Sequence, residues 1–193
     1  MATIHNTTMN PSKLDLLAAW LPAQPWYRRT GQEPELARVG GFRLDDPAGE
    51  VGIEFMVVTD RDVTYQVPMT YRAGALDGAD EALIGTSEHG VLGRRWLYDG
   101  VQDPVLRAQL IALIQGEAEP QAQTVSDTPD LTVTSPLAGT DRPAGDLSVR
   151  ICRVLQPGDS ADGEGSPCLS ATWRLPDGTQ ARGVFAVAMY SQA

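Results

Sequence analysis

Apolar residues alternate with other residues most regularly over positions 51–71. Every second residue is apolar over 51–57 and again over 63–71, and residues 59–62 lie between the two runs. A period of two is typical of a β-strand, because successive side chains point to opposite faces. The sequence therefore predicts a β-hairpin with one buried face. Pro68 lacks an N–H, so we expect the second strand to be an edge or to turn this position away from a neighbour.

A first helix is predicted before the hairpin. Ser12 stands at the N-cap position and Asp15 three residues later, which is the spacing of a capping box. Leucines and Trp20 follow at positions three and four apart, which gives the segment one apolar face. Pro22 cannot continue a helix, so we expect this helix to end at Leu21.

A second helix is predicted after position 103. Asp103 is a good N-cap, and Pro104 suits the first helical position, where no N–H is needed. Apolar residues then recur at three-four spacing as far as Gly116. This helix therefore also has an apolar face to bury.

Residues 36–44 are predicted to form a strand that Gly40 and Gly41 interrupt. A double glycine inside a strand usually marks a β-bulge or a sharp bend. Further segments expected to form strands, strand pairs or turns are 4–8, 81–86, 89–98, 122–125, 131–134, 147–154, 169–175 and 183–190. These elements predict an α+β fold: two main helices packed on a curved, largely antiparallel β-sheet, with an additional C-terminal β-hairpin region.

The composition changes at position 126, where proline- and glycine-rich segments begin. We therefore expect a domain over residues 1–126 and a C-terminal β-rich extension over 127–193, packed on the same sheet. Residues 156–167 form a long loop of small residues within this extension. A chain of 193 residues is long enough for one domain with such an appendage.

The net charge limits the possible partners. The chain has a formal net charge of −10 and a pI near 4.5, so nucleic acids and anionic membrane surfaces would repel it. No basic segment followed by an apolar one begins the sequence, and no apolar run approaches the ~20 residues that span a bilayer. We expect a cytoplasmic protein in which Cys152 and Cys168 are free thiols rather than a disulfide.

Few residues could carry catalysis or hold a cofactor or metal. His5 and His89 are the only histidines. For each, we favour a structural histidine over a general base. No glycine-rich phosphate loop is present, and the acidic loop 158–165 does not match the calcium-loop spacing. The two cysteines have no nearby histidine and do not make a zinc site. We therefore predict no catalytic, cofactor-binding or metal-binding residues.

Aromatic residues concentrate where the first helix ends. Trp20, Trp26 and Tyr27 lie close together with two prolines. Tryptophan rings can stack on sugars, but an aromatic corner between a helix and a sheet more often belongs to the core. The residues that could form a ligand or partner surface are Trp20, Trp26, Tyr27, His89, Arg94 and Arg95.

Four motifs stand in a characteristic order. Segments 20–27, 65–68, 82–86 and 97–104 read WLPAQPWY, YQVP, ALIGT and LYDGVQDP. In this order and spacing they resemble the N-terminal cap of bacterial maltokinases. Pro25 departs from that pattern, because the family usually has arginine there.

The resemblance implies a cap without its kinase body. In maltokinases the cap precedes a kinase-like body that phosphorylates maltose with ATP, on a route that links trehalose to a glycogen-like glucan. The His-Gly-Asp phosphotransfer motif of that body has no counterpart here, since His89 and Gly90 are followed by Val91. The resemblance therefore implies a stand-alone cap-like protein linked to trehalose, maltose or α-glucan metabolism.

Two functions follow as hypotheses. The first is a non-catalytic cap-like module that binds a protein partner or a second copy of itself. The second is a small carbohydrate-binding protein or enzyme with a pocket near Trp26, Tyr27 and His89. Neither hypothesis involves nucleic acid, a membrane or a cofactor.

Overall fold

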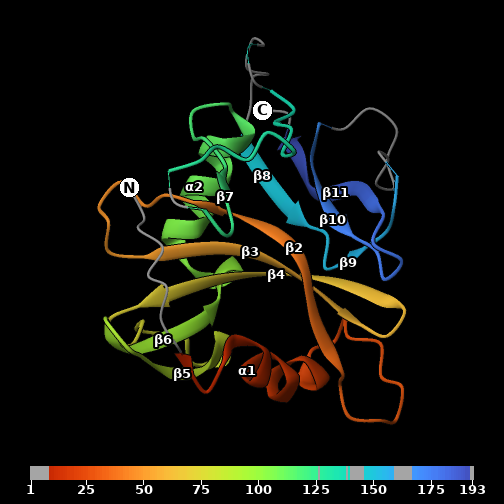
Figure 1. Cartoon of the computed structure of the whole chain (residues 1–193). Coiled ribbons are helices and arrows are strands. Elements are labelled where there is room, and N and C mark those ends of the chain that lie inside the picture. The colour runs from red at the N-terminus through yellow and green to blue at the C-terminus, as the bar shows by residue number, and fades with distance from the viewer. Residues whose placement is uncertain (1–8, 126, 138, 140–145, 159–166, 192–193) are drawn as a thin grey trace.

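An antiparallel sheet dominates the fold (Figure 1). The structure is a computed structural model, and it describes residues 9–125, 127–137, 139, 146–158 and 167–191. The strand expected over 4–8, His5 and most of the loop 156–167 lie outside these residues. The strand order is β1-β5-β6-β4-β3-β2-β10-β11-β8, with β7 beside β2 and β9 beside β4.

The bounds of the elements in this described part follow the chain order. The strands are β1 (Met9–Asn10), β2 (Leu36–Leu44), β3 (Gly52–Asp60), β4 (Val63–Arg72), β5 (Leu83–His89), β6 (Gly93–Asp99), β7 (Gln121–Ala122), β8 (Asp146–Ile151), β9 (Val154–Leu155), β10 (Cys168–Arg174) and β11 (Gln180–Ser191). The helices are α1 (Lys13–Trp20) and α2 (Pro104–Ile114), and the 3-10 turns are η1 (Leu21–Ala23), η2 (Asp80–Ala82) and η3 (Gly100–Gln102).

β3 and β4 pair along their whole lengths, which confirms the predicted hairpin. The expectation that only one face of it is buried is wrong. Phe55 and Val57 belong to one hydrophobic cluster, whereas Met56 and Val58 belong to a second cluster on the other face. Both faces are buried because the alternating apolar residues of the two strands point to opposite sides. Those of β3 lie in the first cluster, whereas Tyr65, Val67 and Met69 of β4 lie in the second, and other elements cover both faces.

α1 covers one face of this hairpin. Ser12 Oγ accepts a hydrogen bond from Asp15 N, and the Asp15 carboxylate accepts one from Ser12 N, so the predicted capping box is present. The α-helix ends at Trp20, and Pro22 lies in the turn η1 that follows. The core on this face consists of Leu17, Leu21, Tyr27, Met56, Val58, Tyr65, Val67, Met69, Ile84 and Leu97.

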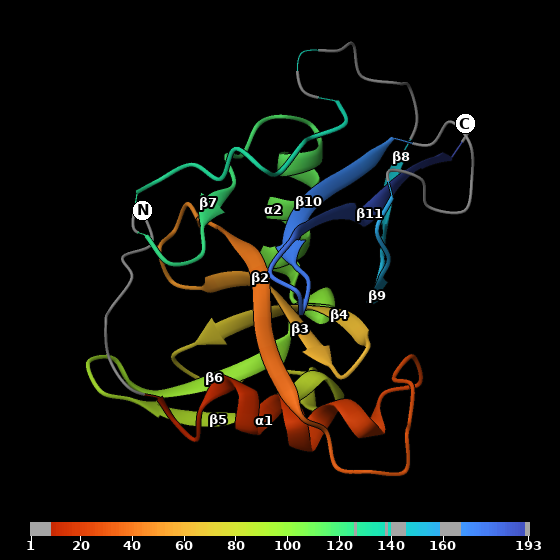
Figure 2. The ribbon, with the colours of Figure 1, turned by 45° about the vertical axis from the view of Figure 1, so that its right-hand side comes forward.

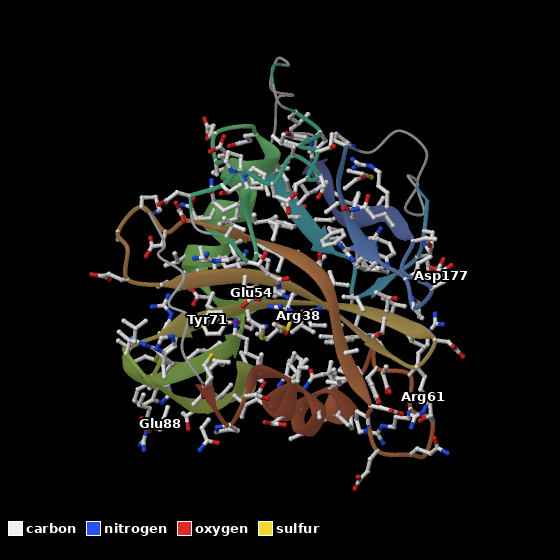
Figure 3. The ribbon with its side chains drawn as sticks, viewed as in Figure 1. Arg38, Glu54, Arg61, Tyr71, Glu88 and Asp177 are labelled. Carbon is white, nitrogen blue, oxygen red and sulfur yellow. The ribbon has the colours of Figure 1, made fainter. Side chains whose placement is uncertain are left out.

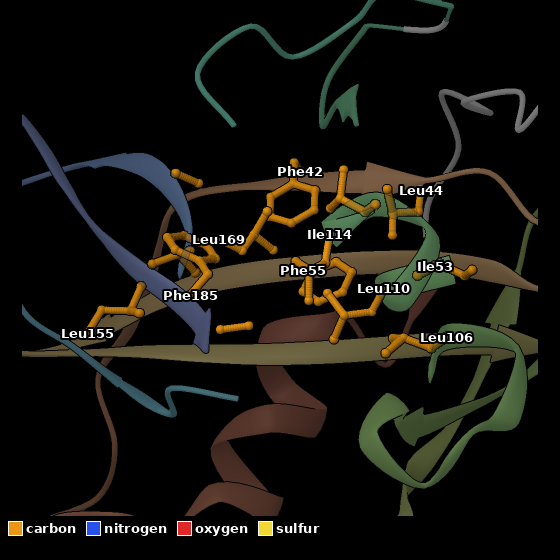
Figure 4. Packing of buried hydrophobic residues seen from close by; sticks show 14 of the residues in the cluster. Phe42, Leu44, Ile53, Phe55, Leu106, Leu110, Ile114, Leu155, Leu169 and Phe185 are labelled. Carbon is orange, nitrogen blue, oxygen red and sulfur yellow. The ribbon is translucent and has the colours of Figure 1, made fainter. Parts of the chain in front are cut away.

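α2 and the C-terminal strands cover the other face (Figure 4). Leu110 and Ile114 of α2 pack in the same cluster as Phe42, Phe55 and Phe185. β10 and β11 form the predicted C-terminal hairpin, and β8 pairs with β11. The α+β prediction therefore holds in outline, with a largely antiparallel sheet. The sheet is larger than expected, and each helix covers only part of one face.

β2 curves along its length (Figure 2), and the irregularity that the double glycine predicts is present. The register against β3 shifts between Arg38 and Gly40, which is a β-bulge. Gly40 pairs with Trp173 of β10, and a Cβ on Gly40 would lie 3.0 Å from the Trp173 Cβ. The missing side chain therefore allows the C-terminal strands to join the sheet beside β2.

β4 is not an edge strand. β6 pairs with residues 69–72 of β4 and β9 with residues 64–65. On this side of β4, Pro68 therefore lies between the two paired segments, where its missing N–H leaves no strand without a donor. The strand predicted over 122–125 is mostly absent. The segment 122–125 contributes only the end of β7, and 131–134 makes one isolated bridge, from Thr134 to Ser170. Asp130 accepts hydrogen bonds from the Thr132 amide and hydroxyl, a local turn that competes with strand pairing.

Candidate functional site

The aromatic corner, residues 20–27, packs into the core beneath α1. Tyr27 is 8% exposed and stacks on Tyr65, with ring centroids 5.4 Å apart. The Trp26 centroid lies 6.0 Å from that of Tyr65 and 5.9 Å from that of Trp20. Trp20 and Trp26 remain half-buried. This packing agrees with the interpretation of the corner as core, and it leaves part of each indole at the surface.

Tyr27 is bonded to a buried carboxylate. Its hydroxyl donates to Asp60 Oδ2 at 2.5 Å, while Asp60 Oδ1 accepts from the Glu35 amide (3.0 Å) and from Arg61 Nη1 (3.1 Å). Burial, together with the hydrogen bond and charge of Asp60, raises the pKa of Tyr27 to about 12. Tyr27 is therefore a neutral, fixed donor at physiological pH, and it ties the corner to the end of β3.

Arg153 connects the C-terminal strands to the corner. Its guanidinium carbon lies 4.9 Å from the Trp26 ring centroid, and its Nη2 lies 2.5 Å from Asp99 Oδ2. Both side chains of this ion pair are largely buried. Gln66 supports the same junction, since its amide donates to Arg153 O at 2.9 Å and its Nε2 to Phe185 O at 3.1 Å. Residues beyond position 127 thus help to hold the corner in place.

Glu54 is the centre of a polar network on the α1 face (Figure 3). It is 3% exposed, and it accepts hydrogen bonds from Lys13 Nζ (2.6 Å), Gln123 Nε2 (2.7 Å) and the Tyr71 hydroxyl. Burial opposes ionisation, but the charge and hydrogen bond of Lys13, with those from Tyr71 and Gln123, hold the pKa of Glu54 below its usual value. Burial and the nearby Glu54 raise the pKa of Tyr71 well above its usual value.

A cavity of about 420 Å³ opens beside Trp20, between η1, η2 and η3. We call it the Trp20 cavity. Its lining consists of Trp20, Gln24, Gly78, Ala79, Asp80, Glu81, Ala82, Asp99 and Gln102. Asp99 is paired with Arg153, whereas Asp80 and Glu81 form no ion pair with any residue that the structure describes. The cavity is therefore rich in hydrogen-bond acceptors beside an indole ring.

His89, Arg94 and Arg95 lie together at the end of the β5–β6 hairpin. We call residues 89–95 the hairpin tip. His89 Nδ1 accepts hydrogen bonds from the amides of Val91 (3.3 Å) and Leu92 (3.1 Å), so the backbone satisfies this histidine, as predicted. Arg94 Nε donates to Glu88 Oε1 at 2.8 Å, and Arg95 Nη2 donates to Leu92 O at 2.8 Å.

The six residues of the predicted surface fall into two separate groups. β1, which precedes α1, pairs with His89 in β5, so the hairpin tip lies near the start of α1. Trp20 ends α1, and Trp26 and Tyr27 follow it. In Figure 1 the free end of the β5–β6 hairpin lies at the left, away from the end of α1 that leads into η1. The structure therefore does not bring His89 to Trp26 and Tyr27, and no single pocket joins them.

The comparison with protein families matches residues 20–103, described as the maltokinase N-terminal cap domain. Residues 20–103, a little less than half of the chain, are therefore similar to a maltokinase N-terminal cap domain. The match begins in the aromatic corner, takes in β2 to β6 and ends at Asp103, the N-cap of α2. The recognition drawn from the four motifs is therefore confirmed. A search of curated proteins found no match.

The cap domain includes all six predicted surface residues, but its contacts extend beyond the matched region. Gln123 reaches Glu54 from outside the match, and Arg153 reaches Asp99 from the C-terminal strands. Sequence reasoning missed these two networks. The one available signal was Glu54 itself, a charged residue within an otherwise apolar strand.

Other chemistry in the cap domain and its extension is limited. Among the described residues, no group of three or more histidine, cysteine, aspartate or glutamate side chains could hold a metal ion. Cys152 and Cys168 are thiols rather than a disulfide, in agreement with the prediction. Within the described ranges, no helix has the length and apolar character needed to cross a membrane.

Proposed function

We propose that the chain is a non-catalytic module that acts by associating with a protein partner, an enzyme of trehalose, maltose or α-glucan metabolism. The match of residues 20–103 to the maltokinase cap carries this proposal. In that family the body, and not the cap, carries the chemistry on maltose, so the matched region suits a role in association better than one in catalysis.

The use of the buried carboxylates supports the non-catalytic part of the proposal. Glu54 is held by donors from α1, from β4 and from the segment after β7, and Asp60 is held by Tyr27, Arg61 and a backbone amide. Asp103 accepts from Arg72 Nε and Nη2, both at 2.7 Å, and from the Val105 amide. A general acid or base must exchange its proton with a substrate, whereas these groups are occupied by fixed donors.

Affinity purification of the tagged full chain from its native cells, after mild crosslinking, tests the proposal. We expect an enzyme that acts on maltose, trehalose or α-glucan to be enriched over a control purification with an unrelated acidic protein. Equal recovery in both purifications contradicts it. In a separate assay with maltose and ATP, we expect no phosphorylation above the buffer rate. Turnover would show that the chain is an enzyme.

A carbohydrate ligand is the second candidate function, and the Trp20 cavity is the observation that favours it. An indole face with Gln24 and Gln102 beside it offers stacking and hydrogen bonds to a sugar. Calorimetric titration with maltose, trehalose and malto-oligosaccharides tests this function. Saturable binding that Gln102→Ala weakens would support it. Heats equal to those of dilution would reject it. Trp26→Ala is the control: a loss of binding in this variant would place the sugar nearer Tyr27 than the Trp20 cavity.

A further inference from the structure

The hairpin tip presents apolar side chains on a rigid turn. Val91 is 63% exposed and Leu92 44%, and they are two of the five large apolar side chains exposed in the described part. The ring of His89 accepts hydrogen bonds from both of their amides, and Arg95 binds Leu92 O. The turn is therefore fixed by its own contacts. Little conformational entropy would be lost if a partner bound it.

Arg94 adds a cation beside these apolar residues. Its side chain is 61% exposed, and within the described residues its hydrogen bond to Glu88 uses Nε alone. Exposed pairs of this kind contribute little to stability, so Glu88 can be exchanged for a stronger partner. The hairpin tip is thus a local basic and apolar projection on a chain whose net charge is −10.

The Trp20 cavity has the complementary chemistry. Asp80, Glu81 and the carboxamide oxygens of Gln24 and Gln102 supply many acceptors, whereas side-chain donors in the lining are few. A sugar hydroxyl can both donate and accept, so a lining of acceptors uses only part of its hydrogen-bonding capacity. A guanidinium only donates, and it also binds well over an indole ring. The lining therefore suits a guanidinium better than a sugar.

We propose that the hairpin tip of one molecule docks into the Trp20 cavity of a second copy. The guanidinium of Arg94 then lies between the Trp20 ring and the carboxylates of Asp80 and Glu81, while Val91 and Leu92 cover the rim. The two surfaces lie at opposite ends of α1, so both stay accessible within one molecule. Because they are different surfaces, the contact is heterologous, and copies add head to tail.

The charges of the two surfaces indicate that a second copy of the chain fills the Trp20 cavity. Each copy supplies the cation that the cavity lacks, at a projecting turn that can enter it. Two chains with a net charge of −10 repel each other at long range, but salt screens that repulsion beyond about 8 Å at physiological ionic strength. The close contact of Arg94 with two carboxylates is screened less. The association is therefore weakest at very low salt, strengthens near physiological salt and weakens again at high salt.

The contact is small, so its association must be measured at high protein concentrations. One hairpin tip buries less than the roughly 1,200 Å² of a stable interface, so the association is weak. Sedimentation velocity of the full chain from about 10 µM to about 1 mM covers the corresponding affinities. We expect the average sedimentation coefficient to rise with concentration and to pass the value of a dimer. A concentration-independent monomer throughout this range overturns the proposal.

Charge reversal on each surface identifies the contact. Arg94→Glu and the double variant Asp80→Arg/Glu81→Arg each keep one intact surface, so each should be a monomer alone. Mixed at equal amounts, they should form a one-to-one dimer that does not grow, because the remaining surfaces cannot pair. Arg107→Glu on α2 and the double variant Glu50→Arg/Asp62→Arg make the same charge changes at other exposed positions and should behave like the wild type. Association that survives Arg94→Glu overturns the proposal.

Glu88→Gln separates docking from a structural role of Arg94. It removes the carboxylate that competes for Arg94, so we expect association several-fold tighter than in the wild type, with unchanged melting temperature. Weaker association in this variant contradicts the proposal. The purification of a metabolic enzyme is a separate readout. If the monomeric variant Arg94→Glu still retains such an enzyme, the proposed function is supported independently of the outcome for self-association.

Discussion

The Tyr27 hydroxyl donates a hydrogen bond to the buried carboxylate of Asp60 at 2.5 Å, across 33 positions of the chain. Tyr27 also stacks on Tyr65, whose hydroxyl accepts a hydrogen bond from the Arg28 amide. One residue thus joins the end of the first helical segment to both strands of the central hairpin. The aromatic corner therefore has a definite structural role as an anchor for α1 on β3 and β4.

Tyr27→Phe should destabilise the protein by about 1–3 kcal/mol, because it removes the shortest of the hydrogen bonds to a buried carboxylate. Chemical denaturation monitored by tryptophan fluorescence measures this loss. Tyr65→Phe is the matched control. It removes a hydroxyl whose partner amide belongs to the exposed Arg28, so it should cost less. Equal losses of unfolding free energy in the two variants would show that the bond to Asp60 contributes no more to stability than the bond of Tyr65 does.

The same bond predicts a decline in stability at alkaline pH. The pKa of Tyr27 is about 12 in the folded state, against an ordinary value of 10.0. Its contribution is therefore complete below pH 10 and is lost as the pH rises through about 12. The unfolding free energy of the wild type should fall more steeply across this range than that of Tyr27→Phe. Parallel curves would contradict the prediction.

The elements that were predicted correctly are those that residues close together in the sequence specify. The Ser12 capping box, the Pro104 helix start and the alternation around Phe55 each follow from a few neighbouring residues, and each is present. What failed depends on distant parts of the chain. The second buried face of β3 exists because α1 covers Met56, and Glu54 is ionised in the core because Lys13 and Gln123 reach it. No periodicity encodes such contacts.

In the candidate site, too, features set by neighbouring residues were predicted and features set by distant contacts were not. His89 was expected to be satisfied by the backbone, which its own turn can provide, and this is confirmed. Its distance from Trp26 could not be foreseen, because it depends on how β5 runs along α1. The Trp20 cavity was missed for a similar reason: its lining comes from the residues on either side of η1, from η2 and the two residues before it, and from Asp99 and Gln102 around η3. These segments approach one another only in the folded chain.

Glu54 predicts how stability changes in acid. Its folded-state pKa lies below the ordinary value, so its contribution is present above that value and is lost as the pH falls toward the lowered folded pKa. Glu54→Gln cannot form the ion pair with Lys13, and it should lose about 3 kcal/mol near neutral pH. Below the ordinary carboxyl pKa its stability should approach that of the wild type. A constant gap at all pH values would contradict this account.

Arg153→Ala should loosen the junction between the C-terminal strands and the cap domain. The substitution leaves Asp99 without its partner in a largely buried position and uncovers the Trp26 ring. We expect a loss of about 3 kcal/mol and a red shift of tryptophan emission in the folded state. Arg174→Ala, at an exposed position of β10, is the control. Unchanged emission with unchanged stability would show that the ion pair does not hold the junction.

Gly41→Ala tests the bend of β2 on which the attachment of β7 and β10 depends. A Cβ at Gly41 would lie 2.1 Å from Phe55 O, within the β2–β3 ladder, and the residue has a φ of +128°. Gly49 also has a positive φ, +70°, but nothing lies within 4 Å of its Cβ position. Gly49→Ala should therefore cost about 1–2 kcal/mol, the penalty of a left-handed backbone.

Gly41→Ala carries an additional cost because neither backbone can move without breaking strand pairing. We expect a loss of more than about 3 kcal/mol, or no stable fold, when the two variants are compared by chemical denaturation. Amide exchange in β10 should rise along with exchange in β2, because the bend places Gly40 against Trp173. If Gly41→Ala unfolds at the same denaturant concentration as Gly49→Ala, the close approach to Phe55 does not determine the bend.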